Sequence, residues 1–213
     1  MRIGITQRIV YDPEHGERRD ALASDWYRFL TAVWPDVVIV PIPNLPEHAA
    51  RLLEALAVEG LLLTGGNDLG TEPDRDRTES DCLTYAARHG LPVIGVCRGF
   101  QMMVAAEGGQ VVRTDRGVHV ATRHPVRCLS DTDWGWTGGG RLDVNSFHGF
   151  AVPGDGLPAG WSALAVGEDR TVEAARSADG RCTAVMWHPE REPAPAAADV
   201  ALFRHRLESK RVP

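Results

Sequence analysis

The feature that most constrains the fold is a cysteine between two glycines, Gly95-Val96-Cys97-Arg98-Gly99. The apolar run Leu91-Pro92-Val93-Ile94 before it has the pattern of a buried parallel strand, and residues 100–107 have the pattern of a helix. A cysteine at such a strand-to-helix turn has the geometry of a nucleophile elbow, where only small neighbours permit a sharp turn. The helix N-terminus also favours the thiolate. The alternative is a buried core cysteine, which is common in strands. The two glycines and the helix favour the nucleophile.

The first half of the chain alternates short apolar runs with amphipathic segments. Strands are predicted at 2–6, 37–40, 60–63 and 91–94, and helices at 18–34, 47–58, 78–89 and 100–107, with a loop at 11–16. This alternation predicts an α/β fold with a parallel-centred sheet and helices on both faces.

The second half of the chain is richer in short strands and turns. We predict strands at 111–112, 124–129, 141–145, 162–166, 171–176 and 182–187, a hairpin at Asp179-Gly180, and a closing helix at 196–207. These strands would add an antiparallel part to the sheet. Because there is no repeat, low-complexity tract or linker, residues 1–213 are expected to form a single domain.

Composition narrows the function. The formal net charge of −6 gives no basic surface for nucleic acid. The four cysteines are widely spaced and form neither a metal-ligand nor a disulfide pattern. The first residues lack the pattern of a signal peptide, and no apolar run is long enough to span a bilayer. We therefore expect a reduced, cytoplasmic protein with no membrane or nucleic-acid partner.

A base for the cysteine is predicted in His188-Pro189-Glu190, which follows the apolar run 184–187. A thiol nucleophile needs a base to accept its proton and a further group to orient that base. His188 has the right pKa range for the first role, and Glu190 can hold the far ring nitrogen. The tripeptide alone is weak support, since it also occurs in ordinary loops. His119 and His124 flank a loop and could be functional or simply solvated.

Two further segments are candidate parts of a site. Acyl transfer needs an oxyanion hole, for which the elbow offers the Arg98 N–H and the end of the third strand offers Gly66. The alternative for Gly65-Gly66 is a plain turn. The segment 145–150 (Asn-Ser-Phe-His-Gly-Phe) is either an ordinary loop or a pocket wall that holds the polar end of a substrate.

Together these motifs resemble the class I glutamine amidotransferase-like superfamily, whose pattern is Gly-x-Cys-x-Gly-x-Gln at the elbow and a late His-Pro-Glu. Segments 97–99, 145–149 and 172–174 are similar to its γ-glutamyl–γ-aminobutyrate hydrolase group, although Phe147 stands where synthase subunits of the superfamily often carry Asn. The resemblance implies a flavodoxin-like fold, the triad Cys97, His188 and Glu190, the oxyanion donors Gly66 and Arg98, and neither a metal nor an organic cofactor. Substrate contacts are implied at Gln101, Ser146, Phe147, His148, Gly149, Phe150 and Glu173.

The start of the chain is similar to the compact enzymes of that group that hydrolyse γ-glutamyl-CDP-amidate. This implies hydrolysis of a small-molecule γ-glutamyl amide through a Cys97 thioester, in a protein compatible with a homodimer. Arg8, at the end of the first strand, and Arg19, at the start of the expected helix, are candidate contacts to an anionic leaving group. The alternative is that these arginines pair with surface carboxylates. A second functional hypothesis is a glutaminase subunit that delivers ammonia to a separate synthase partner.

Overall fold

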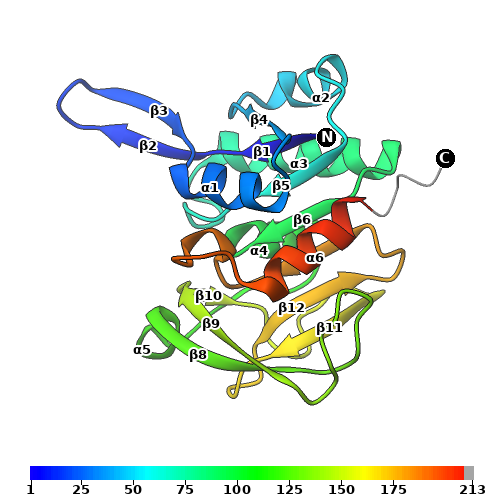
Figure 1. The fold of residues 1–213 in the computed structure, drawn as a ribbon. Coiled ribbons are helices and arrows are strands. Elements are labelled where there is room, and N and C mark those ends of the chain that lie inside the picture. Colours follow the sequence, from blue (N-terminus) through cyan, green and yellow to red (C-terminus); the bar gives the residue numbers. More distant parts are fainter. Residues whose placement is uncertain (209–213) are drawn as a thin grey trace.

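A nine-stranded sheet forms the centre of the computed structural model, which describes residues 1–208 (Figure 1). Five neighbouring strands are parallel, and the remaining four are antiparallel. In sheet order they are β4 (Val38–Ile42), β1 (Arg2–Thr6), β5 (Gly60–Leu63), β6 (Val93–Val96), β13 (Cys182–Val185), β12 (Val172–Ser177), β11 (Trp161–Val166), β8 (Val120–Cys128) and β9 (Arg141–Phe147). The expected parallel-centred sheet with added antiparallel strands is confirmed.

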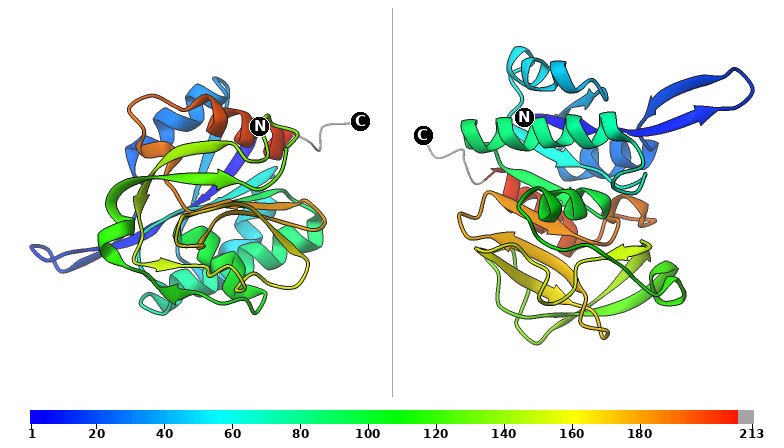
Figure 2. Two further views of the ribbon diagram at one scale, coloured as in Figure 1. Left: turned by 90° about the horizontal axis from the view of Figure 1, so that it is seen from below. Right: turned by 180° about the vertical axis from the view of Figure 1, so that it is seen from behind.

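Helices cover both faces of the parallel strands, as the left view of Figure 2 shows from below. One face carries α1 (Ser24–Val33) and α6 (Ala197–Glu208), and the other carries α2 (Pro46–Ala55), α3 (Pro73–His89) and α4 (Arg98–Ala106). The residues of β5 alternate between the two cores: Leu62 packs with α1 and α6, whereas Leu61 and Leu63 pack with the other three helices. This alternation follows from the two-residue period of a strand that is buried on both faces.

Shorter elements complete the fold. Strands β7 (Val112–Arg113) and β10 (Phe150–Ala151) form a small antiparallel pair. The one-turn helix α5 (Arg116–His119) follows β7, and the 3₁₀ turn η1 (Pro189–Arg191) follows β13 and lies against α1. The predicted hairpin at Asp179-Gly180 is confirmed, because β12 and β13 pair there in antiparallel fashion. In residues 1–208 no helix has the length and apolar character needed to cross a bilayer.

The predicted helix at 18–34 is wrong in its first part. Residues 8–21 instead form a hairpin of β2 (Arg8–Asp12) and β3 (Glu17–Ala21) that projects from the body of the molecule (Figure 1). The Asp12 carboxylate accepts the N–H groups of Glu14 and His15, and Gly16 adopts a φ of +65°, so the local turn chemistry closes a hairpin. The helix begins at Ser24, where the buried apolar spacing starts.

Candidate active site

Cys97 lies between β6 and α4 in the conformation expected of a nucleophile elbow. Its φ of 53° and ψ of −108° are a strained combination for a residue with a side chain, and such strain is concentrated at functional sites. Its N–H donates to the Val185 carbonyl at 2.9 Å. A Cβ built on Gly99 would collide with the Leu63 backbone, and one on Gly95 with Met103. The two glycines are therefore required by close packing around the turn.

His188 stands beside Cys97 because β13 and β6 are neighbours in the sheet, with Val185 opposite Val96. The position of a Cβ on Gly65 would lie 2.7 Å from His188 Cε1 and 3.6 Å from Cys97 Cβ, so both side chains border one point. Burial lowers the pKa of His188, but the Cys97 sulfur and then the Glu190 carboxylate raise it by more, to about 9. At neutral pH the imidazole therefore holds its proton next to the sulfur.

The two ring nitrogens of His188 differ in their surroundings. Nδ1 lies 2.8 Å from Glu190 Oε1, whereas Nε2 is buried without an oxygen or nitrogen partner among the described residues. Glu190 thus orients the ring, and Nε2 is the nitrogen available to the sulfur. The structure brings all three residues of the expected triad together.

Asn145 fixes the backbone that carries His188, a role that sequence reasoning missed. Its side-chain oxygen accepts the His188 N–H at 2.9 Å, and its Nδ2 donates to the His188 carbonyl at 2.8 Å. Because 43 residues separate the two positions, no local pattern indicates this clamp. The sequence gives one indirect indication of this role, which is that Asn145 is the first residue of the candidate pocket segment 145–150.

The expected oxyanion donors, Gly66 and Arg98, lie at the ends of the neighbouring strands β5 and β6. The buried Arg75 guanidinium donates to the carbonyls of Thr64 (2.8 Å), Gly65 (3.0 Å) and Gly66, which fixes this strand end. The Arg98 side chain turns away and pairs with Asp76 and Glu79. Only the backbone of Arg98, at the first turn of α4, is therefore offered to a substrate. Sequence reasoning also missed Arg75.

Burial shifts both arginines of this group without discharging them at neutral pH. Desolvation lowers the pKa of Arg75 to about 10 and that of Arg98 to about 9. The positive charge of Arg75 also lowers the pKa of Arg98. Glu79 lies between them, since its Oε1 is 3.1 Å from Arg75 Nε and its Oε2 contacts Arg98. The paired charges hold β5, α3 and α4 in one arrangement beneath the elbow.

The expected glutamyl-binding residues meet at one turn. Gln101 Nε2 donates to the Phe150 carbonyl at 3.0 Å, and His148 Nδ1 lies 2.9 Å from the same oxygen. The Ser146 hydroxyl donates to the His119 carbonyl, so it is occupied within the fold. Phe147 is 40% exposed, and its ring lies edge-on to His188 with centroids 5.8 Å apart. Gly149 completes the turn, and Glu173 lies buried behind it.

A family model described as Peptidase C26 matches residues 2–190. The chain belongs to the Peptidase C26 family. It is 28% identical to the γ-glutamyl-CDP-amidate hydrolase of Campylobacter jejuni, over 90% of this chain and 91% of the relative. It is 32% identical to a candidate glutamine amidotransferase of Mycobacterium tuberculosis, over 88% of this chain and 67% of that protein.

Among solved structures, a candidate GMP synthase subunit from Thermoplasma acidophilum superposes with a TM-score of 0.72 at 20% identity. The superposition covers 98% of this chain and 92% of that one. At this identity it shows the fold alone, which is the flavodoxin-like fold of the glutamine amidotransferases. The family model and the curated relatives, together with this fold, confirm the resemblance to the class I glutamine amidotransferase-like superfamily.

In this C26 chain the two candidate leaving-group arginines lie in different surroundings. Arg8 lines a cavity of about 30 Å³ together with Gly65, His188 and Glu190, and no carboxylate within residues 1–208 forms an ion pair with it. Arg19 lies on β3, not at a helix start, and pairs with Asp12 at 2.9 Å and with Glu17. The expected place of Arg19 at the start of a helix is therefore wrong, because the helix begins at Ser24.

Arg191 is a second cation at the mouth of the cavity, and sequence reasoning missed it. It lines the same cavity as Arg8, and its guanidinium lies 4.5 Å from the centroid of the Phe147 ring. Its Nε is 3.8 Å from Glu190 Oε1, and its side chain is 37% exposed. Arg191 directly follows the His188-Pro189-Glu190 tripeptide, and this position next to the predicted base is the sequence signal that could have identified it.

Proposed function

We propose that this chain hydrolyses a γ-glutamyl amide with Cys97 as nucleophile. The observation that carries the proposal is the strained cysteine at a strand-to-helix turn, beside a buried histidine that a glutamate orients at 2.8 Å. A cysteine with an adjacent base and an orienting carboxylate is the arrangement of acyl-transfer enzymes. Membership of the Peptidase C26 family and the similarity to a γ-glutamyl-CDP-amidate hydrolase support the γ-glutamyl substrate.

In the first half of the proposed reaction, the Cys97 sulfur attacks the γ-carbonyl carbon and the C=O electron pair moves onto oxygen. The N–H groups of Gly66 and Arg98 stabilise that oxyanion. As the oxyanion collapses, the C–N bond breaks and His188 Nε2 gives its proton to the leaving nitrogen. A γ-glutamyl thioester on Cys97 and a free amine or amidate result.

In the second half, a water molecule replaces the leaving group. His188 accepts a proton from this water as the oxygen attacks the thioester carbonyl, and the same two N–H groups stabilise the second oxyanion. The C–S bond then breaks with its electron pair on sulfur, so that glutamate leaves and the thiolate stands again beside the protonated His188. Glu190 holds the ring in place throughout.

Replacement of Cys97 tests this proposal. Cys97→Ala should fold normally and reduce glutamate release from a γ-glutamyl amide by on the order of 10⁴-fold or more, because no other nucleophile is in place. Glutamate should be measured by a coupled assay on a panel of γ-glutamyl amides, with free glutamine included. Activity of the variant within tenfold of wild type would contradict the mechanism.

The same panel tests the second hypothesis, a glutaminase subunit of a synthase. A freestanding hydrolase is active when purified alone, whereas a subunit that needs a partner to adopt its active state has little activity on any substrate. Release of glutamate from amides other than glutamine by the isolated chain would favour the hydrolase. Little activity of the isolated chain on any amide, glutamine included, would favour the subunit.

A further inference from the structure

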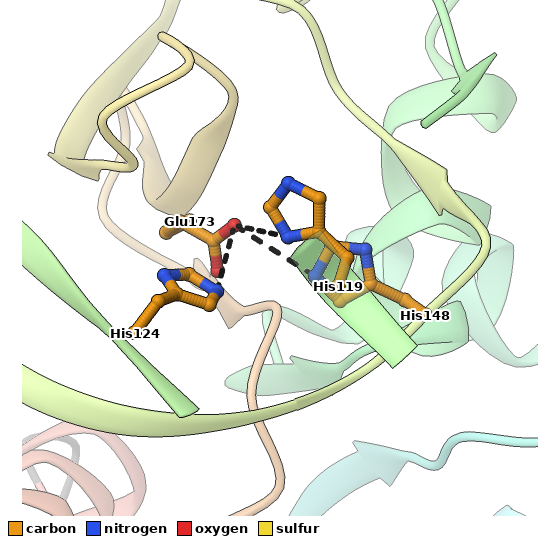
Figure 3. A group of neighbouring side chains, drawn as sticks. All are labelled: His119, His124, His148 and Glu173. Carbon is orange, nitrogen blue, oxygen red and sulfur yellow. Dashed lines mark ion pairs between the residues drawn. The ribbon is translucent and has the colours of Figure 1, made fainter. Parts of the chain in front are cut away.

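Four side chains outside the triad meet in the second half of the chain (Figure 3). His119 ends α5, His124 lies on β8, His148 follows β9, and Glu173 lies on β12. One ligand atom from each lies within 4.8 Å of all the others. His119 Nδ1, His124 Nε2, His148 Nε2 and Glu173 Oε2 are each buried without a hydrogen-bond partner among the described residues. The Glu173 oxygen nearest the imidazoles is Oε1, which accepts the Thr171 hydroxyl at 3.3 Å. Three unpartnered imidazole nitrogens around this buried carboxylate need an explanation.

Hydrogen bonds among these four side chains do not account for the unpartnered atoms. Glu173 Oε1 lies 3.9 Å from His119 Nδ1, 4.0 Å from His124 Nε2 and 3.7 Å from His148 Nε2. All three distances exceed those of a hydrogen bond. In a tetrahedral site with metal–ligand bonds near 2.0 Å, neighbouring ligand atoms are about 3.3 Å apart. Side-chain movements of about 0.5–1 Å would therefore bring the four atoms to coordination distance.

In His119 and His148, the ring nitrogen that points away from Glu173 has a hydrogen-bond partner, as is usual for histidines that bind a metal ion. His119 Nε2 lies 2.7 Å from Asp169 Oδ2, and His148 Nδ1 lies 2.9 Å from the Phe150 carbonyl. A metal-binding histidine almost always donates its other N–H to a carboxylate or a backbone carbonyl, which aims the free lone pair at the ion. Here both bonds direct the lone pairs of His119 and His148 toward Glu173.

We propose that His119, His124, His148 and Glu173 form a binding site for a divalent first-row transition metal such as Zn²⁺. Three imidazoles and one carboxylate suit Zn²⁺ and its neighbours, and four protein ligands close a tetrahedral site, as in structural metal centres. His124 is 13% exposed at its side chain, while the other three are at most 1% exposed, so an ion reaches the site from the side of His124.

The site would tie β12 to α5, β8 and the turn after β9, and β12 shares no ladder with β8 or β9 because β11 lies between them in the sheet. His148 belongs to the turn whose Phe150 carbonyl also accepts Gln101 Nε2, and Gln101 lies on the helix of the elbow. A bound ion would therefore stabilise the wall of the active site without touching the substrate. The inference thus reassigns His148 and Glu173 from substrate contacts to metal ligands, and it stands independently of the proposed reaction.

The test measures metal binding in the Cys97→Ala variant, since removing the thiol also removes a competing soft ligand. After treatment with a chelator, the protein is titrated calorimetrically with Zn²⁺, and its visible spectrum is recorded with Co²⁺. We expect one equivalent to bind with a dissociation constant below about 1 µM. The Co²⁺ spectrum should show tetrahedral ligand-field bands without a sulfur charge-transfer band.

Substitutions then locate the ion. His124→Ala should weaken Zn²⁺ binding by more than about 100-fold, and Glu173→Gln should also weaken it. Asp169→Asn should weaken it by about 10–100-fold. This residue is partly exposed, its Oδ2 contacts the far nitrogen of His119, and its Oδ1 accepts two hydrogen bonds from Thr171 rather than facing the cluster. His89→Ala, which removes an exposed histidine stacked on Tyr85, is the matched control and should bind as the parent does.

Two outcomes would overturn the inference. One is the absence of saturable binding in the parent, which would leave the orphaned atoms to be served by water alone. The other is binding that His124→Ala and Asp169→Asn leave unchanged, which would place the ion elsewhere. Since neither readout is activity, failure here and failure of the proposed hydrolysis are distinguishable.

Discussion

At the scale of single residues, His188 uses its two ring nitrogens for two different purposes. Nδ1 is held by Glu190, and Nε2 faces the reacting groups. His188→Asn should therefore reduce kcat/KM about as much as Cys97→Ala does, and the double variant should fall little below either single one, because the residues act as a unit. Steady-state kinetics of the three variants measure this. Losses that multiply would show that the two residues act independently.

Glu190→Gln should be less damaging, and it should alter the pH profile. Cys97 and Glu190 together raise the pKa of His188 to about 9 against the effect of burial. Removing the Glu190 charge lowers that pKa, so a protonated His188 is lost at a lower pH. The alkaline limb of the kcat/KM profile should move to lower pH in the variant, as a pH series on one γ-glutamyl amide would measure. An unmoved alkaline limb would mean that another group sets it.

The charge of the leaving group is a further question at this scale. If Arg8 selects an anionic leaving group, Arg8→Ala should raise KM by about tenfold for a phosphate-bearing γ-glutamyl substrate and leave a neutral one almost unchanged. Added salt should weaken the first reaction more than the second. Arg19→Ala is the matched control on the same hairpin and should change neither, because Arg19 is paired with Asp12 and Glu17. An equal loss for both substrates in Arg8→Ala would make Arg8 structural.

The site residues that could be predicted from sequence are those with a local signature. Cys97 is announced by its glycines and by the strand and helix around it, and His188 by its strand and by Glu190 two residues on. Arg75 and Asn145 carry no such signature. Arg75 acts on carbonyls up to 11 residues earlier, and Asn145 acts on a residue 43 positions later, so only the folded sheet brings the partners together.

At the scale of elements, the hairpin of β2 and β3 depends on an anchor outside itself. Two isolated strands are marginally stable in water. Asn67, in the loop after β5, accepts the Ile9 N–H at 2.8 Å and donates to the Ile9 carbonyl at 3.0 Å, as a neighbouring strand would. This side chain ties the base of the hairpin, and with it Arg8, to the end of the sheet.

Asn67→Gly removes that anchor and keeps the positive φ of 50° that the position requires. Two hydrogen bonds to Ile9 worth about 1 kcal/mol each are lost, together with one that Arg75 donates to Asn67 Oδ1 at 3.1 Å. Amide exchange in residues 8–21 should therefore accelerate by about tenfold or more. Hydrogen exchange measured by mass spectrometry would show it, with the peptides of β5 and β6 as internal controls. Unchanged exchange in the hairpin would mean that other contacts hold it.

The hairpin also explains why the sequence misleads here. Residues 17–20 have no buried side chain, so the segment carries no apolar period that distinguishes a strand from a helix. Its conformation is set by the turn at Asp12 and Gly16 and by the pairing of β2 with β3. This pairing joins two separate segments, so the pattern of one segment alone does not indicate it. The buried strands and amphipathic helices, in contrast, carry their periods in the sequence, and they were predicted within a few residues.

At the scale of the whole molecule, α6 closes the fold by covering the sheet beside the strand that carries His188. Asp199 on this helix accepts the Trp187 Nε1–H at 2.9 Å, and the two residues are 5% and 2% exposed. Burial raises the pKa of Asp199 to about 6, an effect that the hydrogen bond from Trp187 opposes. Burying the ionised Asp199 carboxylate therefore lowers the free energy of unfolding at neutral pH.

The sign of the pH effect follows from this shift. The unfolded carboxyl loses its proton near pH 4, whereas the folded one keeps it up to about pH 6, so the stability due to the neutral form is present below pH 4 and is lost as the pH rises to 6. Asp199→Asn keeps the acceptor for Trp187 and has no charge. Relative to wild type, its free energy of unfolding should rise by up to about 2–3 kcal/mol between pH 4 and pH 6.5.

Urea denaturation of both proteins across this range measures the difference. Asp36→Asn, at an exposed position between α1 and β4, is the control and should keep a constant difference from wild type. Asp199→Ala should lower stability by about 1–3 kcal/mol relative to Asp199→Asn, because it leaves the Trp187 N–H buried without an acceptor. A wild-type advantage over Asp199→Asn at pH 6.5 would show instead that the ionised carboxylate stabilises the junction between α6 and the strand of His188.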